Sequence, residues 1–330
     1  MPFYVLLGLS AFLISLLGTR LLIITLRRKS LLLDMPKLRG NHKTPTPRGG
    51  GIAVTFAIII CMSIADIHFA IILSALLLAA ISLLDDLIQV PSGVRLLVQI
   101  MAVAIALITI DTPLFGGILP IWLERCILGL LWIWFTNAFN FMDGIDGISA
   151  AEMMAIGGGA ALVVVMMGAF PSSLSLYGII IAAAGCGFIW WNWQPAKIFL
   201  GDVGSIPIGF LLGYLLLLTS LNGHIYAALI LPAYYIADSS ITLFQRISRG
   251  ERIWVAHSEH YYQKAVRSGR SHGAVVRYIT CLNIILVCLA IYAELLPELA
   301  PFILCAAYLA VTMLLKFFAH TKHNPQQELF

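Results

Sequence analysis

The sequence predicts an all-α, polytopic membrane protein of about eleven transmembrane helices, forming a single integral membrane domain over residues 1–330. Three observations support this fold class. Hydrophobic residues make up 60% of the chain and charged residues 11%, whereas about a quarter of the residues in soluble domains are charged. The mean hydropathy is +0.95. The apolar residues lie in long runs, and no stretch between two runs is long enough for a separate soluble core.

Eleven apolar runs are each long enough to cross, or nearly cross, a hydrocarbon layer that takes about 20 helical residues. The second and third runs are short, and the break between them at residues 66–68 predicts a tight turn. The expected spans are residues 3–26, 51–65, 67–84, 93–110, 120–139, 147–169, 174–191, 205–221, 224–243, 276–294 and 299–318.

The basic residues predict the orientation, because Lys and Arg are concentrated in cytoplasmic loops. They follow the first, ninth and eleventh runs, whereas Arg125 is alone among acidic residues on the opposite side. We therefore expect the N-terminus outside the cell and the C-terminus in the cytoplasm. The first run lacks a basic leading segment and a small-residue cleavage site, so we interpret it as an anchor.

With this orientation, acidic motifs at the ends of distant runs fall on the cytoplasmic face. Carboxylates at membrane depth are costly unless they face water, a metal or a partner, so their convergence indicates a site. The chemistry that they suggest is metal-assisted handling of a phosphate at the membrane surface. The five residues are Asp85, Asp86, Asp143, Asp146 and Asp202.

Asp85 and Asp86 close the third run. Adjacent carboxylates raise each other's pKa, so the pair requires a cation, a metal or open water. Arg95, about one turn into the fourth run, is the expected counter-charge. The alternative is a pair of solvated charges at a helix end.

Polar residues then recur every third position at Asn137, Asn140, Asp143 and Asp146. On a helix end this spacing keeps the side chains on one slowly drifting face. The glycines that follow each aspartate permit a turn and the close approach of a ligand. An Asx-rich turn is the alternative, and the spacing of a calcium-binding loop is absent.

The segment KIFLGDVGS precedes the eighth run. Asp202 and Ser205 either cap that helix or, with its free N–H groups, hold Mg²⁺ and a diphosphate together. Phe199 offers a flat face on which a base can stack, or it is a packing residue.

The segment KTPTPRGGG is stiff and basic and then rich in glycine. Its Lys43 and Arg48 either serve as topology signals and contact lipid headgroups, or they bind a phosphate that approaches the backbone. The spacing of a P-loop is missing.

The segment HSEHYYQ lies in the long basic loop after the ninth run. His257 and His260 share a helical face, and we favour contact with a substrate phosphate over zinc, because no third ligand or HExxH pattern is evident. A solvated loop is the other alternative. Asp238 in the ninth run is expected to be a buried polar residue with a structural role.

These motifs, in this order, resemble the polyprenyl-phosphate N-acetylhexosamine-1-phosphate transferase family (glycosyltransferase family 4). The resemblance covers about residues 37–263. It implies an eleven-span enzyme of the bacterial inner membrane with a cytoplasmic active site. Such enzymes transfer a sugar 1-phosphate from a UDP-N-acetyl-amino sugar to undecaprenyl phosphate, release UMP and require Mg²⁺, with Mn²⁺ as the alternative ion. The motifs are PTPRGGG, LLDD, NAFNFMDGIDG, KIFLGDVGS and HSEHYYQ.

The resemblance also implies roles. Asp202 is the metal ligand, and Asp85, supported by Asp86, contacts or deprotonates the lipid phosphate. Phe199 stacks on uracil. The further catalytic positions are Asp143, Asp146, His257 and His260, and the further substrate-binding positions are Lys43, Arg48, Asn137, Asn140, Asn192 and Lys197.

Two departures point to one branch of the family. The pentapeptide translocases have three consecutive histidines where this chain has HSEHYYQ, and the first loop here carries Arg48. We therefore favour the branch that starts O-antigen or another surface glycan over the phospho-MurNAc-pentapeptide transferases. GlcNAc, FucNAc and QuiNAc all remain open as the sugar.

The expected partners are the two substrates and membrane lipids, and we expect no nucleic acid. The resemblance to the family also implies a homodimer. A secondary transporter is the alternative from another class. Transporters place ionisable residues near the bilayer midplane, often in repeats, whereas these carboxylates gather at one face.

Overall fold

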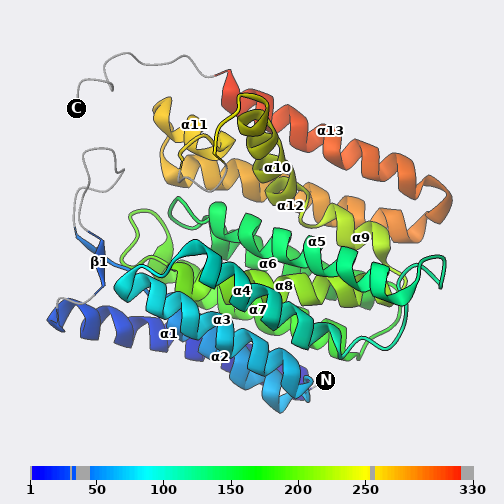
Figure 1. The fold of residues 1–330 in the computed structure, drawn as a ribbon, viewed down its shortest axis with the longest axis horizontal. Helices are drawn as coiled ribbons and strands as arrows, with labels where there is room; N and C mark the ends of the chain where they lie inside the picture. Colours follow the sequence, from blue (N-terminus) through cyan, green and yellow to red (C-terminus); the bar gives the residue numbers. More distant parts are fainter. Residues whose placement is uncertain (1, 30–31, 35–44, 253–256, 321–330) are drawn as a thin grey trace.

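The computed structural model describes residues 2–29, 32–34, 45–252 and 257–320, and most of them are helical. Long helices lie alongside one another in a bundle (Figure 1). The helices before residue 200 are α1 (Pro2–Lys29), α2 (Gly51–Ile64), α3 (Phe69–Ile88), α4 (Ser92–Leu107), α5 (Ile121–Phe141), α6 (Ile148–Met166) and α7 (Ser173–Asn192). The later ones are α8 (Asp202–Leu221), α9 (Ile225–Ile230), α10 (Ala233–Ser248), α11 (Tyr261–Arg267), α12 (His272–Leu295), the 3₁₀ turn η1 (Pro297–Leu299) and α13 (Ala300–Ala319).

The predicted helical runs are confirmed in position. Ten of them contain one long helix each, and the ninth is broken into α9 and α10 at Pro232. Proline lacks a backbone N–H and its ring clashes with the preceding turn, which explains the break. The turn at residues 66–68 is also confirmed, with the His68 ring accepting a hydrogen bond from the Ala70 N–H at 3.1 Å.

Seven helices of the described part of the chain are long and apolar enough to cross a membrane. α2 and α4 are apolar but shorter. The count of eleven spans and the orientation therefore stay predictions. The seven are α1, α3, α6, α7, α8, α12 and the segment Pro297–Ala319.

α8 lies in the interior of the bundle. In its most apolar 18-residue stretch 83% of the residues are buried, against 22% for the segment that contains α13. α3 and α5 pack against it, and so do α2 and α9. The residues at the start of α8 are therefore held at one end of the best-packed helix.

The starts of α2 and α8 touch through their backbones. A Cβ atom added to Gly51 would lie 2.1 Å from the Gly204 Cα, and one added to Gly204 would lie 2.5 Å from the Gly51 Cα. Glycine at both positions permits this approach. The contact brings the loop before α2 against the loop before α8.

Backbone hydrogen bonds join these same two loops. The Phe199 N–H donates to the Pro47 carbonyl at 2.9 Å, and the Phe199 carbonyl accepts from Gly49 and Gly50 at 3.1 and 2.8 Å. The loop before α2 also contains β2 (Thr46–Pro47), which pairs antiparallel with β1 (Leu33–Asp34) at the end of the bundle away from α9 (Figure 1).

Candidate active site

A chain of alternating carboxylates and guanidinium groups lies where α3 ends and α8 begins. Arg95 Nη1 is 2.5 Å from Asp85 Oδ2 and 3.8 Å from Asp202 Oδ2. Arg48 Nη2 is 2.7 Å from Asp202 Oδ1, and Arg48 Nε is 3.5 Å from Asp86 Oδ1. The predicted pairing of Arg95 with the Asp85–Asp86 pair is confirmed. Three carboxylates from two distant motifs thus share two arginines.

Asp85 and Asp86 face different partners because successive residues on a helix point about 100° apart. Asp85 Oδ1 also accepts a hydrogen bond from the Val90 N–H at 2.8 Å, which holds it to the turn after α3. Asp86 Oδ2 accepts one from the Val203 N–H at 3.3 Å, in the first turn of α8. The Asp86 side chain is 4% exposed and that of Arg48 is 44% exposed, so the arginine covers a buried carboxylate.

Asp202 is the first residue of α8, where free N–H groups and the helix dipole favour an anion. Gly201 before it has φ 75°, and a Cβ there would lie 3.1 Å from Arg48 and 3.3 Å from Asp86. In the first turn, the Ser205 hydroxyl accepts a hydrogen bond from the Asn140 amide at 2.8 Å. The end of α5 is thereby fixed to the start of α8.

The expectation that four polar residues share one helix face is wrong beyond Asn140. α5 ends at Phe141, and the chain turns at Gly147 with φ 84° before α6 begins. Asp143 and Asp146 therefore lie in a loop. Asn137, by contrast, lies on α5 and exchanges hydrogen bonds with Gln99 of α4, at 2.8 and 3.3 Å.

Asp143 belongs to the same cluster of carboxylates. It accepts a hydrogen bond from the Ser149 hydroxyl at 2.6 Å. Burial raises the pKa of Asp143 to about 7, against the opposing effects of Ser149 and Arg48, while the charges of Asp202 and Asp86 raise it further. A carboxyl group with a pKa near neutrality can take up and release a proton at physiological pH.

Asp146 and Asn192 instead hold loops together. Asp146 is buried, accepts a hydrogen bond from the Ala196 N–H at 3.0 Å and lies 3.3 Å from the His272 ring nitrogen at the start of α12. The Asn192 amide accepts from the Gly147 N–H at 2.9 Å and donates to a carbonyl of the loop before α8 at 3.0 Å. Neither residue joins the chain of arginines and carboxylates, so their direct roles in catalysis and binding stay predictions.

The remaining basic and aromatic candidates lie at the edge of the cluster. Phe199 is half-buried and forms a parallel bridge with Arg48, beside the acidic chain. Lys197 is exposed, with its ammonium group 5.1 Å from the centre of the Trp191 ring. Lys43 lies outside the described residues.

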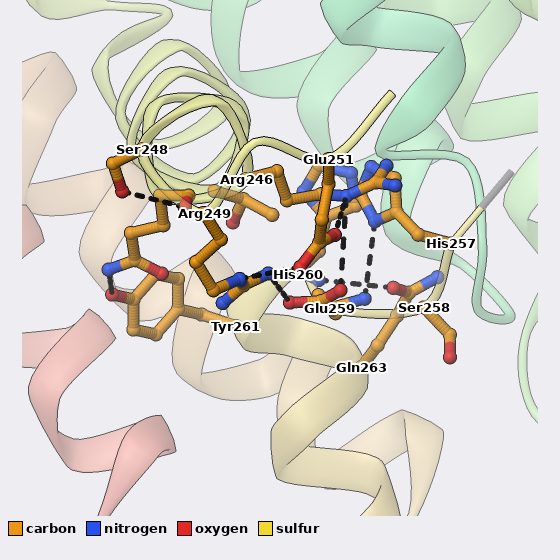
Figure 2. Close-up of polar contacts among 12 residues, drawn as sticks. Arg246, Ser248, Arg249, Glu251, His257, Ser258, Glu259, His260, Tyr261 and Gln263 are labelled. Carbon is orange, nitrogen blue, oxygen red and sulfur yellow. Dashed lines mark hydrogen bonds and ion pairs between the residues drawn. The ribbon is translucent and has the colours of Figure 1, made fainter. Parts of the chain in front are cut away.

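The loop with the two histidines is fixed by a network of ion pairs (Figure 2). Glu251 accepts from Arg246 at 2.8 Å and from Arg249 at 2.6 Å. Glu259 lies 2.5 Å from Arg249 and 3.9 Å from Arg246. Both ends of the segment between α10 and α11 are thus joined to the same two arginines at the end of α10.

The histidines lie beside the loop that contains Asp143. The His260 ring is buried, 6.4 Å from the Phe141 ring and 5.0 Å from the His257 ring, measured between centroids. The Tyr262 hydroxyl donates to the Phe141 carbonyl at 3.0 Å. Burial, with His260 and Arg246 adding to it, lowers the pKa of His257 to about 4, so its ring is neutral at physiological pH.

The site also contains residues that no motif indicated. Gln99, Ser149 and His272 bond to Asn137, Asp143 and Asp146, but each is an isolated polar residue at a helix start or inside an apolar run. Their partners become visible only once the helices are packed.

The cluster fits a hard divalent cation that is shared with a phosphate. Within the described ranges no three His, Cys, Asp or Glu side chains are arranged to hold a metal ion. Mg²⁺ usually binds one or two carboxylates together with substrate phosphates, and it prefers oxygen ligands. Asp202, with Asp86 close to it through Arg48, supplies such a partial ligand set.

Residues 68–220 match the family model described as glycosyl transferase family 4. A probable undecaprenyl-phosphate N-acetylglucosaminyl 1-phosphate transferase of Bacillus subtilis (strain 168) is 28% identical over 295 residues, covering 83% of this chain and 82% of the relative. A phospho-N-acetylmuramoyl-pentapeptide-transferase of Desulforapulum autotrophicum is 28% identical over 270 residues, covering 67% and 73%. The same enzyme of Arthrobacter sp. is 26% identical over 325 residues, covering 77% and 88%. The matched segment contains all five acidic residues expected at the site and runs through the whole of the interior helix but its last residue, so the similarity to glycosyl transferase family 4 covers the acidic cluster.

Proposed function

We propose that the protein transfers an N-acetyl-amino-sugar 1-phosphate from a UDP-sugar to undecaprenyl phosphate and releases UMP. The observation that carries the proposal is the chain Asp85–Arg95–Asp202–Arg48–Asp86 at the start of α8. It gathers hard oxygen donors and guanidinium groups in one place, as a reaction between two phosphates requires. The names of the relatives support the same substrate class.

The reaction is a displacement at phosphorus. An oxygen of the lipid phosphate attacks the sugar-bearing phosphorus of the donor, and the bond to UMP breaks. Such a transfer needs mainly positioning and electrostatic stabilisation. Arg48 and Arg95 present planar forks that suit phosphate oxygens, and each already lies against a carboxylate that a phosphate group would replace. Mg²⁺ bound at Asp202 would offset charge and align the diphosphate.

The acidic residues take the remaining catalytic roles. Asp85, with Asp86 beside it, contacts or deprotonates the lipid phosphate. Asp143, whose pKa is about 7, can hold a proton near the diphosphate. Direct attack by the lipid phosphate is favoured over a phospho-aspartyl intermediate, because the lipid phosphate is already an anionic nucleophile. His257 and His260 contact the sugar phosphate.

We assign the protein to the initiation of a surface glycan such as O-antigen, at the cytoplasmic face of the bacterial inner membrane. The HSEHYYQ segment supports this branch, since its two histidines are separated by two residues. A phospho-MurNAc-pentapeptide donor is the second candidate, because relatives that act in that reaction cover 67% and 77% of the chain.

The test is UMP release by the purified protein with undecaprenyl phosphate and Mg²⁺. The donors are UDP-GlcNAc, UDP-FucNAc, UDP-QuiNAc and UDP-MurNAc-pentapeptide, each with and without the lipid. We expect lipid-dependent UMP from one amino-sugar donor and none from the pentapeptide. Turnover of the pentapeptide alone would move the protein to the other branch. Absence of both UMP and UDP-sugar binding would contradict the proposal.

A further inference from the structure

A fully buried carboxylate in α10 lies directly behind the histidine segment. Asp238 is 0% exposed. Its oxygens contact groups from two consecutive helices, α10 and the start of α11. They are the Tyr261 N–H at 3.0 Å, the Tyr262 N–H and the His260 Nδ1 at 3.2 Å, and the Tyr234 and Thr242 hydroxyls at 3.3 Å.

This arrangement bears on which ring nitrogen of His260 carries a proton. A carboxylate that accepts two backbone N–H groups acts as an acceptor, so a ring nitrogen 3.2 Å from Asp238 Oδ1 must donate. This contact favours the tautomer of neutral His260 that carries its proton on Nδ1. Nε2 is left to accept a hydrogen bond or, once protonated, to donate one.

The ring itself is held in place by its neighbours. Tyr262 stacks on His260 with centroids 5.8 Å apart and planes 16° apart, and the Phe141 ring lies 6.4 Å away at 28°. Phe141 ends α5, two residues before Asp143. Asp238 and the two aromatic rings thus hold the position of a histidine at the edge of the carboxylate cluster.

We propose that Asp238 is a positioning residue that holds His260 as the Nδ1–H tautomer, with Nε2 assigned to the phosphate of the sugar donor. The proposal rests on the proposed function for the reaction, but the tautomer itself does not. Asp238 lies behind His260 and acts through its ring. The pair works as a carboxylate and histidine do in other enzymes, where the acid orients the imidazole.

Two other roles for Asp238 have to be distinguished. Asp238 accepts the Tyr261 and Tyr262 N–H groups, so it also caps α11, and loss of the cap alone would lower stability. Alternatively, the His260 side chain accepts the Gln263 N–H at the start of α11, and if Nδ1 is the acceptor the proton lies on Nε2. The first role predicts no change in the ring's tautomer, and the second predicts the opposite tautomer.

The spectroscopic test is ¹⁵N NMR of the full-length protein labelled at histidine, with the His260 signals assigned by their loss in His260→Gln. We expect the Nδ1–H tautomer in the wild type. Asp238→Asn should convert His260 to a mixture or to the Nε2–H form. Thr242→Val is the matched control, since it removes one hydrogen bond to the same oxygen and does not touch the ring. We expect it to leave the tautomer unchanged.

The kinetic test uses the same variants in the UMP assay. Asp238→Asn should lower kcat about tenfold or more while the KM for the UDP-sugar stays within about twofold. The double variant Asp238→Asn with His260→Gln should lose little more kcat than either single variant, because both substitutions disrupt the same carboxylate–histidine pair. Thr242→Val should retain kcat within about twofold.

Three results would overturn the proposal. They are an Nε2–H tautomer in the wild type, an unchanged tautomer in Asp238→Asn, and losses of kcat that multiply in the double variant. A wild type that releases no UMP from any donor would contradict the proposed function instead, and the NMR result would still decide the tautomer.

Discussion

Arg48 Nη2 lies 2.7 Å from Asp202 Oδ1, and this contact joins the loop before α2 to the first residue of α8. The same guanidinium lies 3.5 Å from Asp86. One arginine therefore compensates two carboxylates from motifs more than a hundred residues apart. Because the side chain is 44% exposed, an incoming phosphate can reach it from solvent.

Replacement of Arg48 by alanine should weaken substrate binding and shift the pH dependence. The guanidinium lowers the pKa of Asp143, so its loss should raise that pKa further above 7. We expect the KM for the UDP-sugar to rise about tenfold or more, the cost of a charge-assisted hydrogen bond. The pH profile of kcat/KM should move to higher pH. Arg28→Ala, at an exposed position near the end of α1, is the control. Unchanged KM and pH profile would exclude a substrate role for Arg48.

Asp202→Ala should abolish magnesium-dependent turnover, because the first residue of α8 is the proposed metal ligand. Binding of Mn²⁺, followed by electron paramagnetic resonance in the presence of the UDP-sugar, should weaken in parallel. Asp111→Asn provides a matched control, since Asp111 is exposed between α4 and α5, beyond the end of α4 opposite to Arg95. Undiminished activity in Asp202→Ala would eliminate the metal assignment.

The buried carboxyl group of Asp143 should make stability depend on pH. Burial raises its pKa in the folded protein to about 7, above the ordinary value of 3.8, so the folded state holds this proton more tightly than the unfolded state. The contribution to stability is then full below pH 3.8 and is lost as the pH rises toward 7. Between pH 5 and pH 8 the melting temperature should fall, and Asp143→Asn should reduce that fall.

The comparison that tests Asp143 is the difference in melting temperature between pH 5 and pH 8. Asp111→Asn should keep the wild-type difference. An equal pH dependence in Asp143→Asn and the wild type would show that Asp143 is not the group responsible.

A methyl group at Gly204 should disrupt the contact between α2 and α8. The new Cβ would lie 2.5 Å from the Gly51 Cα, which is backbone and cannot rotate away. Overpacking of this kind costs about 1–3 kcal/mol, so Gly204→Ala should lower the melting temperature and activity together. Gly93→Ala is the control, because a Cβ there meets nothing within 4 Å. Wild-type stability in Gly204→Ala would show that the helices separate readily.

A polar contact inside the bundle gives a further stability test. Glu152 of α6 accepts a hydrogen bond from the Asn283 amide of α12 at 2.7 Å, and both residues are buried. Glu152→Ala leaves the amide without its acceptor, which costs about 1–3 kcal/mol. Glu152→Gln keeps the shape and an acceptor oxygen, so its melting temperature should stay close to that of the wild type. Equal losses in the two variants would indicate that packing, not the hydrogen bond, is responsible.

The positions of the helices were predictable because long apolar runs can be recognised without knowledge of their neighbours. The break at Pro232 interrupts the ninth run, and it was missed because hydropathy does not register a lost backbone hydrogen bond. The meeting of Asp85, Asp86 and Asp202 followed from their common side in the predicted topology, and Arg95 followed from its proximity in sequence.

The detailed pairing was beyond the sequence because it depends on how the helices approach. A spacing of three predicted that Asp143 and Asp146 continue the face of Asn137 and Asn140, but the helix ends at Phe141. The partners Ser149 and His272 come from other segments of the chain and have no local pattern. Asp238 was expected to be structural, yet its bonds to the histidine segment connect it to the site.

The backbone contact between Gly51 and Gly204 also limits how the enzyme can open. The starts of these two helices touch without intervening side chains and have no soft layer between them, so we expect the starts of α2 and α8 to move together. Arg48 and Asp202, which flank this contact, then form an immobile wall of the site. We expect substrate entry and product release to depend instead on Glu251 and Glu259, whose ion pairs with Arg246 and Arg249 can break and re-form.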